Sequence, residues 1–466
     1  MISSPSIATP FSSDAATSKL FDQSALSTLA QRLVEAARRA GADAADAVAV
    51  RGISQGVEVR DGRVEESERS EGDDVGLRVL VGQRQAVVST NDVSGDGVAK
   101  LAERAVAMAR VAPDDKYVGL ADPSLLARDF PDLDLLDPNI PSTSELERRA
   151  CEAEAAALAV KGVTKSGGAS ASSGIGGMVL VTSSGFHGSY LRSSQGVSMT
   201  AIVGDGTAME RDYDYTSAPH AFDLRPAESV GRTAGERTVA RANPRKVETC
   251  KVSVVFDPRV SGSLVGHLVG AVNGSSIARK TSFLKDRLGQ QLFAKNIRII
   301  DDPLRLRGLR SQPFDAEGVK VKRLAIVDGG VLTTWLLDCA TARELGLVTT
   351  GRAHRGVSSS PSPGPYNLHL EAGEPTPTEL MSDIKQGFYV TDLIGSGVNS
   401  VTGDYSRGAS GFWIENGKRG YPVSEVTIAG NLIDIFRELS PANDLEFRFG
   451  TNAPTVRVEG LTVAGR

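Results

Sequence analysis

The stretch Ser263-Leu-Val-Gly-His-Leu-Val-Gly-Ala-Val-Asn-Gly274 decides how the second half of this chain is organised. Its apolar residues lie around most of the circumference of a helix, and they are Leu264, Val265, Leu268, Val269 and Val272. This pattern predicts a buried helix over residues 260–273. Glycines at 262, 266, 270 and 274 leave flat patches on the helix, where another backbone or a peptide is able to come close.

Strands and hairpins surround this helix in the sequence. Residues 252–256 form an apolar run that predicts a strand. Leu324–Trp335 predicts a hairpin that turns at Asp328-Gly329, and Gly411–Lys418 predicts another that turns at Asn416-Gly417. Because a buried helix needs a layer to pack against, we expect residues 245–466 to form one β-rich, barrel-like domain with a few inserted helices.

The start of the chain predicts a smaller α/β subdomain over residues 21–113. Apolar residues at helical spacing predict helices at 24–40 and 97–110. Asp61-Gly62, between them, is a strong turn signal inside a run of strand patterns, so an antiparallel sheet packed against helices is expected. Residues 1–20 are rich in Ser, Thr and Ala, and we expect a disordered tail there, not a signal peptide.

Residues 114–244 are predicted to form a central α+β subdomain, which begins with a polar, proline-punctuated linker. Ser142-Thr-Ser-Glu145 has the pattern of a capping box and opens an alanine-rich helix. Gly167–Gly177 is expected to be a flexible turn between strands, because it is rich in Gly, Ser and Ala and matches no phosphate-binding motif. Asn243-Pro244 marks the next boundary. The predicted fold class is α+β.

Composition and charge narrow the classes of function. The net charge is −5 and aromatic residues make up 5% of the chain, so neither a basic face nor a stacking platform for nucleic acid is expected. Cys151, Cys250 and Cys339 form no C-x-x-C pair, which argues against a disulfide framework or a zinc knuckle and favours a reducing cytoplasm. No apolar run approaches the roughly 18 residues of a membrane helix, so no membrane contact is expected.

Histidines are the first candidates for chemistry. His267 is the ionisable side chain of the 260–273 helix, and it is either a hydrogen-bonded core residue or a functional group. A zinc site needs three or four convergent His, Cys or carboxylate ligands, and no second histidine or acid lies within two helical turns of His267. Asn367, His369 and Glu371 alternate along one predicted strand, so they belong either to a solvated strand face or to a metal cup.

The segment Gly395–Gly411 concentrates five glycines among hydroxyl residues. Loops of this kind present backbone N–H groups and let a ligand backbone approach closely. We therefore expect substrate binding here, and the candidate residues are Gly403, Asp404, Tyr405 and Arg407. A serine nucleophile is not favoured, because the chain has no G-x-S-x-G elbow and no histidine base close in sequence.

Several longer segments are similar to the TldD/PmbA family, whose members were once called modulators of DNA gyrase. They include Gly266-His-Leu-Val-Gly-Ala-Val-Asn-Gly-Ser275, Pro313-Phe-Asp-Ala-Glu-Gly-Val319, Gly403-Asp-Tyr-Ser-Arg-Gly-Ala-Ser-Gly-Phe-Trp-Ile-Glu-Asn-Gly417 and Tyr421-Pro-Val-Ser-Glu-Val-Thr-Ile-Ala-Gly-Asn-Leu432. The resemblance runs from about residue 20 to the end and is densest after residue 245. It implies the biology of a cytoplasmic metalloprotease that acts on peptides or unfolded chains.

The resemblance also implies a branch of the family. TldD-like members carry a His-Glu-x-x-x-His metal helix and a later cysteine ligand, whereas PmbA-like members, also called TldE, lack them. Here Gly266 and Ala271 stand at the two histidine positions and His267 stands at the glutamate position. No cysteine follows Asn443-Asp-Leu445. The implied chain is a non-catalytic, PmbA/TldE-like subunit that holds no metal itself.

Partners follow from the same resemblance. It implies a heterodimer with a TldD-like paralogue that carries the zinc and cleaves the substrate. Two other hypotheses stay open: a homodimeric peptide-binding or regulatory protein, related to gyrase or to a toxin–antitoxin pair, without protease partnership, and an independent hydrolase that uses His267 with Asp404 or another distant acid. Docking of extended peptides by strand addition would suit the predicted β-rich domain.

Overall fold

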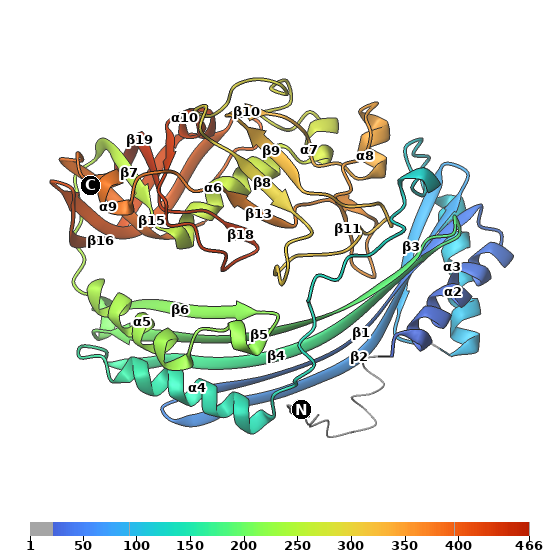
Figure 1. Ribbon diagram of the computed structural model, residues 1–466, viewed down its shortest axis with the longest axis horizontal. Helices are drawn as coiled ribbons and strands as arrows, with labels where there is room; N and C mark the ends of the chain where they lie inside the picture. Colours follow the sequence, from blue (N-terminus) through green and yellow to red (C-terminus); the bar gives the residue numbers. More distant parts are fainter. Residues whose placement is uncertain (1–21, 93, 396, 466) are drawn as a thin grey trace, which may run out of the picture.

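The computed structural model describes residues 22–92, 94–395 and 397–465. Long strands of the first half form a curved sheet, and the second half lies over one face of that sheet (Figure 1). Helices of the first half cover the opposite face (Figure 1). The tail predicted at residues 1–20 lies outside the described residues. Within them, no helix combines the length and the apolar character that crossing a membrane requires.

The sheet of the first half is antiparallel, in the order β3-β2-β1-β4-β5-β6. Its strands are β1 Ala44–Arg60, β2 Arg63–Val81, β3 Arg84–Thr90, β4 Lys165–Thr182, β5 His187–Val203 and β6 Glu210–Ala218. The predicted turn joins β1 to β2, with Asp61 (φ 52°) and Gly62 (φ 71°) in the left-handed region that a two-residue hairpin needs. Strands from residues 21–113 and 114–244 share this one sheet, and the predicted domain boundaries stay a prediction.

The flexible turn predicted at Gly167–Gly177 is wrong, because these residues lie inside β4. Ala169, Ala171, Ser173 and Ile175 are buried, and the residues between them are at least partly exposed. Both faces of this segment carry Gly, Ala or Ser, so the period of two that marks a strand is hard to see in the sequence. Pairing with β1 on one side and β5 on the other supplies the order that a glycine-rich segment lacks by itself.

The helices of the first half are α2 Ser24–Arg39, α3 Gly95–Val111, α4 Thr143–Leu158 and α5 Ala227–Ala240, with short 3-10 turns η1 Pro123–Leu125, η2 Gly206–Ala208 and η3 Ala221–Asp223. The Ser142 hydroxyl caps α4 as predicted and accepts a hydrogen bond from the Glu145 backbone N–H at 3.2 Å. The reciprocal half of the capping box does not form. The Glu145 carboxylate instead binds Arg148 and Arg149, which lowers the pKa of Glu145 to about 2.

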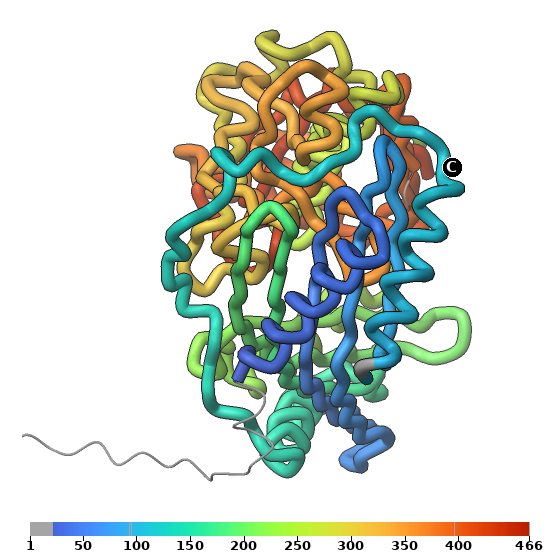
Figure 2. Tube along the Cα trace, turned by 90° about the vertical axis from the view of Figure 1, so that its right-hand side faces the viewer, coloured from blue at the N-terminus to red at the C-terminus, as the bar shows by residue number. Residues whose placement is uncertain are grey.

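The linker predicted before α4 runs along the edge of the molecule, from the end of α3 to the start of α4 (Figure 2). It is irregular apart from η1. It also contacts the second half, because Leu126 forms a β-bridge with Val319 and the Arg343 side chain donates hydrogen bonds to the carbonyl oxygens of Tyr117 and Leu120. The linker therefore helps to hold the two halves together.

A five-stranded barrel dominates the second half. It consists of β7 Cys250–Phe256, β14 Gln386–Ile394, β15 Asp404–Glu415, β16 Lys418–Asn431 and β19 Val456–Ala464, and β17 Leu439–Pro441 extends it. The strands close into a barrel because β16 pairs with both β15 and β19. The largest apolar core of the protein lies between this barrel and its neighbouring elements. The predicted α+β class with a barrel-like C-terminal region is confirmed.

A second sheet packs beside the barrel in the order β10-β9-β8-β13-β18. Its strands are β8 Ile299–Asp302, β9 Leu324–Asp328, β10 Val331–Leu332, β13 Asn367–Leu370 and β18 Thr451–Asn452, and β11 Ala353–His354 pairs with β12 Ser362–Pro363. The inserted helices are α6 Pro258–Ala271, α7 Gly274–Ala278, α8 Cys339–Glu344, α9 Pro377–Met381 and α10 Leu432–Arg437. The hairpin turn at Asn416-Gly417 is confirmed. The other turn falls one residue later than predicted, at Gly329-Gly330, because Asp328 pairs with Val331.

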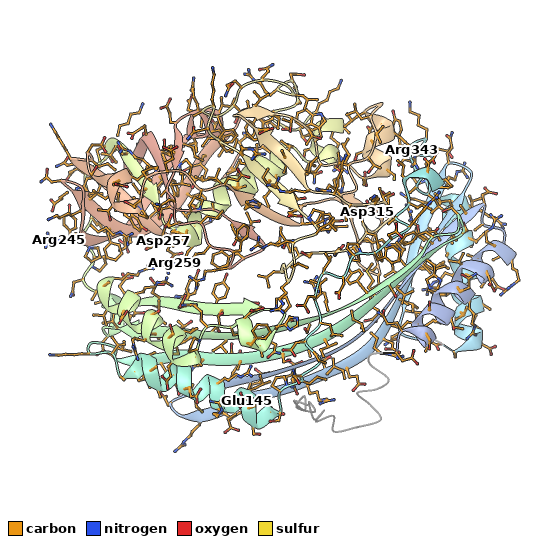
Figure 3. The ribbon with its side chains drawn as sticks, viewed as in Figure 1. Glu145, Arg245, Asp257, Arg259, Asp315 and Arg343 are labelled. Atoms are coloured by element: carbon orange, nitrogen blue, oxygen red, sulfur yellow. The ribbon has the colours of Figure 1, made fainter. Side chains whose placement is uncertain are left out.

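The two halves meet at both ends of the curved sheet. At one end, the Arg259 guanidinium at the start of α6 donates to the Asp212 carboxylate of β6 at 2.8 Å. Figure 3 labels Arg259, which lies between the second half and the sheet. At the other end, Arg355 binds the buried Asp46 of β1, and the Phe186 and Phe314 rings lie 5.1 Å apart. Further contacts lie between these ends, because Arg192 of β5 donates to the Leu309 carbonyl oxygen and the Tyr215 ring of β6 packs against the Phe449 ring.

Candidate functional site

Helix α6 lies at the centre of the second half and packs against β7, β13, β14 and β18. Asp257 caps its N-terminus by accepting from the Arg259 backbone N–H at 3.0 Å, and Pro258 occupies the first turn. Its apolar residues are buried as predicted. Gly266 and Gly270 are exposed, and a Cβ atom built on either glycine meets no other atom within 4 Å. One face of α6 is thus a bare backbone surface.

The two positions that the resemblance assigned to metal histidines lie on different sides of α6. Gly266 is exposed, whereas Ala271 is 4% exposed and belongs to the main apolar core. Neither residue has a ligand atom in its side chain. Across the described residues, no group of three or more His, Cys, Asp and Glu side chains is arranged to hold a metal ion. The residues of α6 therefore do not fit the zinc site of the TldD-like branch.

His267 projects from the same side of α6 as the exposed glycines and contacts β15. Its ring meets the Tyr405 ring edge-on, with 5.8 Å between the ring centroids. Burial, together with the positive charge of Arg407, lowers the pKa of His267 to about 4, so the imidazole is neutral at physiological pH. Its Nε2 atom is buried without a hydrogen-bond partner. His267 is thus not the hydrogen-bonded core residue that was one of the two alternatives.

The structure places the four predicted substrate-binding residues in two groups. Tyr405 and Arg407 lie on alternate positions of β15 and both interact with His267, although 138 and 140 positions separate them from it in the sequence. The Asp404 carboxylate instead accepts hydrogen bonds from the Thr402 hydroxyl and from the Asn431 side-chain amide. Gly403 is buried beside the Phe283 ring with φ 81°. The predicted loop is shorter than expected, because β15 begins at Asp404.

A cavity of 1070 Å³ lies between the first-half sheet and the barrel. Strands β5 and β6 line one side, and β14, β15 and β16 line the other, including Leu393, which accepts a hydrogen bond from Arg407 at its carbonyl oxygen. Met209, Tyr213 and Ile394 expose apolar surface to this region. Arg407, whose charge acts on His267, therefore also contacts the wall of this cavity.

Sequence analysis missed the charged residues of this cavity. The Arg241 guanidinium lies 3.6 Å from each of three carboxylates, those of Glu210, Asp212 and Asp392. Burial raises the pKa of Glu210 despite this arginine. These residues come from β6, β14 and the end of α5, and no local motif relates them. Their meeting depends on the docking of the two halves.

One face of the curved sheet points toward the second half (Figure 1). Many residues on this face of β1, β4 and β5 are small. Along each strand, residues of this face alternate with residues of the opposite face. The opposite face packs against α4 and α5 and buries Val57, Ala171 and Val197. Cross-strand neighbours on the inner face are Ser54, Gly174 and Ser194 in one row, Gly56, Ser172 and Gly196 in the next, and Glu58, Ser170 and Ser198 in the third. The first two rows offer hydroxyl groups and backbone without bulky side chains, whereas the third carries Glu58 and continues to Tyr215 on β6.

Strand addition at β6 is blocked by arginines. β6 is an edge strand of the sheet. The Tyr215 carbonyl oxygen on it accepts hydrogen bonds from Arg225 at 2.9 Å and from Arg448 at 3.2 Å, and the Tyr213 carbonyl oxygen accepts from Arg237 at 3.4 Å. An added strand would need those acceptors. The predicted docking of peptides by strand addition finds no support at this edge.

Other predicted candidates have structural partners. The Asn367 side chain accepts from the Arg310 backbone N–H and donates to Ser311, and the Glu371 carboxylate pairs with Arg298 and Arg323. His369 contacts the Phe447 ring. The metal cup suggested for this strand is therefore not formed by these three side chains.

Two acidic residues of the second half, Asp301 and Asp315, are fully buried. The Asp301 carboxylate pairs with Arg352 at 2.6 Å, and both side chains are 0% exposed. Asp315 accepts from three backbone N–H groups, and burial beside Glu317 raises its pKa to about 8. Figure 3 shows Asp315 where the second half meets the sheet. These carboxylates hold loops in place.

The comparisons with known proteins agree with this architecture. Residues 45–109, 136–242 and 249–465 match domain 1, the central domain and the C-terminal domain of the PmbA/TldA metallopeptidases. The metalloprotease PmbA of Escherichia coli O157:H7 is 40% identical over 417 residues, which cover 89% of this chain and 90% of that protein. This chain belongs to the PmbA/TldD metallopeptidase family. A PmbA homologue of Haemophilus influenzae is 38% identical and covers 93% of this chain and 94% of its own length.

Solved structures of the family share the fold. A Bacteroides thetaiotaomicron protein described as a modulator of DNA gyrase superposes with a TM-score of 0.86 at 28% identity, over 94% of this chain and 98% of its own. TldE of Thermococcus kodakarensis gives a TM-score of 0.83 at 18% identity, over 94% of this chain and 100% of its own. The predicted membership in the PmbA/TldD family is thereby confirmed, and the architecture described above is that of the family.

Proposed function

We propose that this chain is a PmbA/TldE-like subunit of a cytoplasmic PmbA/TldD-type zinc metallopeptidase that acts on peptides or unfolded chains. In this proposal the chain supplies substrate-binding surface, and a TldD-like paralogue supplies the zinc and the catalytic groups. The observation that carries the proposal is the absence of metal-ligand side chains at residues 266 and 271 of α6. The side chains of Gly266 and Ala271 have no ligand atoms, and the two residues face different sides of the helix, so these positions supply no part of a zinc site.

The inner surface between the two halves supports the role in substrate binding. Small residues of β1, β4 and β5 face the second half, and α6 exposes its backbone at Gly266 and Gly270. The cavity of 1070 Å³ lies between β5 and β6 of the sheet and β14, β15 and β16 of the barrel. An extended peptide presents its own backbone and needs close approach more than it needs specific side-chain pockets, so these surfaces suit a substrate of variable sequence.

The charge on the outer edge of β2 favours a partner other than a second copy of this chain. β3 pairs with β2 only from Val75 onward, so among the described residues the outer edge of residues 63–74 has no strand beside it. This segment holds six acidic and two basic residues, and it is almost wholly exposed. Two copies that paired through this edge would bring like charges together, which is unfavourable across strands. A paralogue with a basic edge would not meet this repulsion.

Hydrolysis of an unstructured peptide tests the proposal. We expect no cleavage by this chain alone with added zinc, and faster cleavage by an equimolar mixture with its metal-bearing paralogue than by the paralogue alone. A chelator should abolish the activity of the mixture, and so should replacement of the paralogue's metal histidines. Cleavage by this chain alone would contradict the proposal. A mixture no more active than the paralogue would favour the alternative of a homodimeric peptide-binding or regulatory protein.

A further inference from the structure

Three buried polar atoms without hydrogen-bond partners gather where α6 meets β15. They are Nε2 of His267, the hydroxyl oxygen of Tyr405 and Nε of Arg407. Tyr405 is 1% exposed, and its ring contacts the His267 ring. A buried polar atom without a partner is costly, so three of them in one place call for a ligand or another explanation.

The chemistry of these groups is that of an anion site. The Arg407 Nε–H and the Tyr405 hydroxyl are donors, and a neutral histidine donates from one ring nitrogen. The positive charge of Arg407 acts on both neighbours, because it lowers the pKa of His267 and opposes the rise that burial causes in the pKa of Tyr405. The adjacent acid, Asp404, is bound to Thr402 and Asn431 instead. The cluster therefore carries the positive charge of Arg407. The Nε–H of this arginine has no acceptor, whereas its terminal amino group donates to the Leu393 carbonyl oxygen.

The exposed glycines give a ligand access to this cluster. Gly266 and Gly270 flank His267 on the exposed side of α6, and the space above them is open. His267 and Arg407 are half-buried, so part of each side chain reaches the protein surface. The Gly266 side of α6 also lets a peptide backbone lie close beside the cluster.

We propose that His267, Tyr405 and Arg407 bind a carboxylate of an extended peptide that lies across the glycine face of α6. The inference rests on the proposed function, which makes a peptide the substrate, and it names the chemical group that this subunit recognises. Arg407 supplies a charge-assisted hydrogen bond, Tyr405 and His267 complete the set of donors, and the peptide passes over Gly266 and Gly270. The carboxylate belongs either to the C-terminus of the peptide or to an acidic side chain.

Peptide affinity for the full-length chain by itself tests the site. Three labelled peptides of one unstructured sequence are compared by fluorescence anisotropy: one with a free C-terminus and no acid, one with an amidated C-terminus, and one amidated with an internal Glu. We expect amidation to weaken binding at least about tenfold. Recovery of affinity with the internal Glu would assign the site to acidic side chains, and no recovery would assign it to chain termini. Equal affinity of all three peptides would overturn the proposal.

Matched tyrosine variants separate this site from a general effect on folding. Tyr405→Phe removes one unpartnered hydroxyl and keeps the ring, so the protein should stay folded while the affinity for carboxylate peptides falls several-fold. Tyr366→Phe is the control, because the Tyr366 hydroxyl is also buried without a partner beside a histidine, His354, at 4.5 Å between ring centroids. Equal effects of the two variants would refute the site.

Histidine resonances provide a second measurement that does not depend on proteolysis. The chain has five histidines, so the His267 signal is assignable in a histidine-labelled sample by substitution. Saturating carboxylate peptide should shift the His267 signal and leave that of His354 in place. An unmoved His267 signal would overturn the inference. A carboxylate-dependent shift, combined with no gain of proteolysis in the paralogue mixture, would uphold this site and reject the proposed protease partnership.

Discussion

Replacing Gly266 or Gly270 with alanine should strengthen the fold and weaken peptide binding. Both glycines lie within α6, and a Cβ atom at either position meets nothing within 4 Å. Alanine in a helix interior is more favourable than glycine by about 0.5–1 kcal/mol, so the double variant should gain about 1–2 kcal/mol. In a domain of about 150–250 residues, a change of 1 kcal/mol shifts Tm by about 2–4 °C. The Tm of the double variant should therefore rise by about 2–8 °C.

The same methyl groups occupy the surface along which a peptide is proposed to lie. Forcing a bound backbone away from a fitted contact costs about 1–3 kcal/mol, so the double variant should bind the carboxylate peptide about tenfold more weakly. Thermal unfolding and fluorescence anisotropy on one preparation measure both effects. A variant that is more stable and binds the peptide with unchanged affinity would refute the glycine face as a ligand surface.

Gly274→Ala is the matched control in the neighbouring helix. Its Cβ atom would lie 2.7 Å from the Thr341 hydroxyl and 2.8 Å from the Leu336 carbonyl oxygen, so this substitution should destabilise the protein. Opposite signs for Gly266→Ala and Gly274→Ala are expected if the environments are as described. A loss of stability in both variants would contradict the open surface above Gly266.

Three further predictions concern the rest of the fold. Ser142→Ala removes the cap of α4 and should lower the free energy of unfolding in urea by about 1 kcal/mol; no change would mean that solvent satisfies the Glu145 N–H equally well. Gly231→Ala should lower it by about 1–3 kcal/mol, because the added methyl collides with the Ala153 carbonyl oxygen where α5 packs on α4; a stabilised variant would contradict that contact. Burial lowers the pKa of both His267 and His354 to about 4 from an ordinary 6.5. Between these two pH values the unfolded chain binds more protons than the folded chain. The free energy of unfolding therefore falls as the pH drops from about 6.5 to 4. The loss should be about 1–3 kcal/mol per histidine, and a His267→Asn/His354→Asn variant should lose less stability over this window; equal pH dependence of variant and wild type in urea titrations would exclude the effect.

Local chemistry made much of the fold predictable. Asp61-Gly62 and Asn416-Gly417 specify their hairpins because both residues of such turns need positive φ, which these residue types adopt readily. Apolar spacing placed α2, α3 and α6 within one or two residues of their observed bounds. The prediction was wrong at Gly167–Gly177, because β4 owes its order to neighbours on both sides and not to its own residues.

The candidate site was predictable only in parts. His267, Tyr405 and Arg407 were each noticed for a local reason, one as the ionisable group of an apolar helix and two as members of a glycine-rich segment. The glycine face was visible as glycines at a spacing of four. Arg241 with Glu210, Asp212 and Asp392 gave no signal, because the four side chains come from different elements and their role depends on distance in space.

By itself the sequence determined helices α2, α3 and α6, the α+β class and the absence of ligand side chains at residues 266 and 271, since each of these depends on residues close together in the chain. The tertiary structure alone decided that Gly266 and Ala271 face different sides, and that His267 meets residues about 140 positions away. Barrel closure through β16 and β19 fixes where β15 lies, and docking of the curved sheet creates the cavity beside it. Contacts of this kind are set by the register and packing of distant strands, which no local pattern encodes.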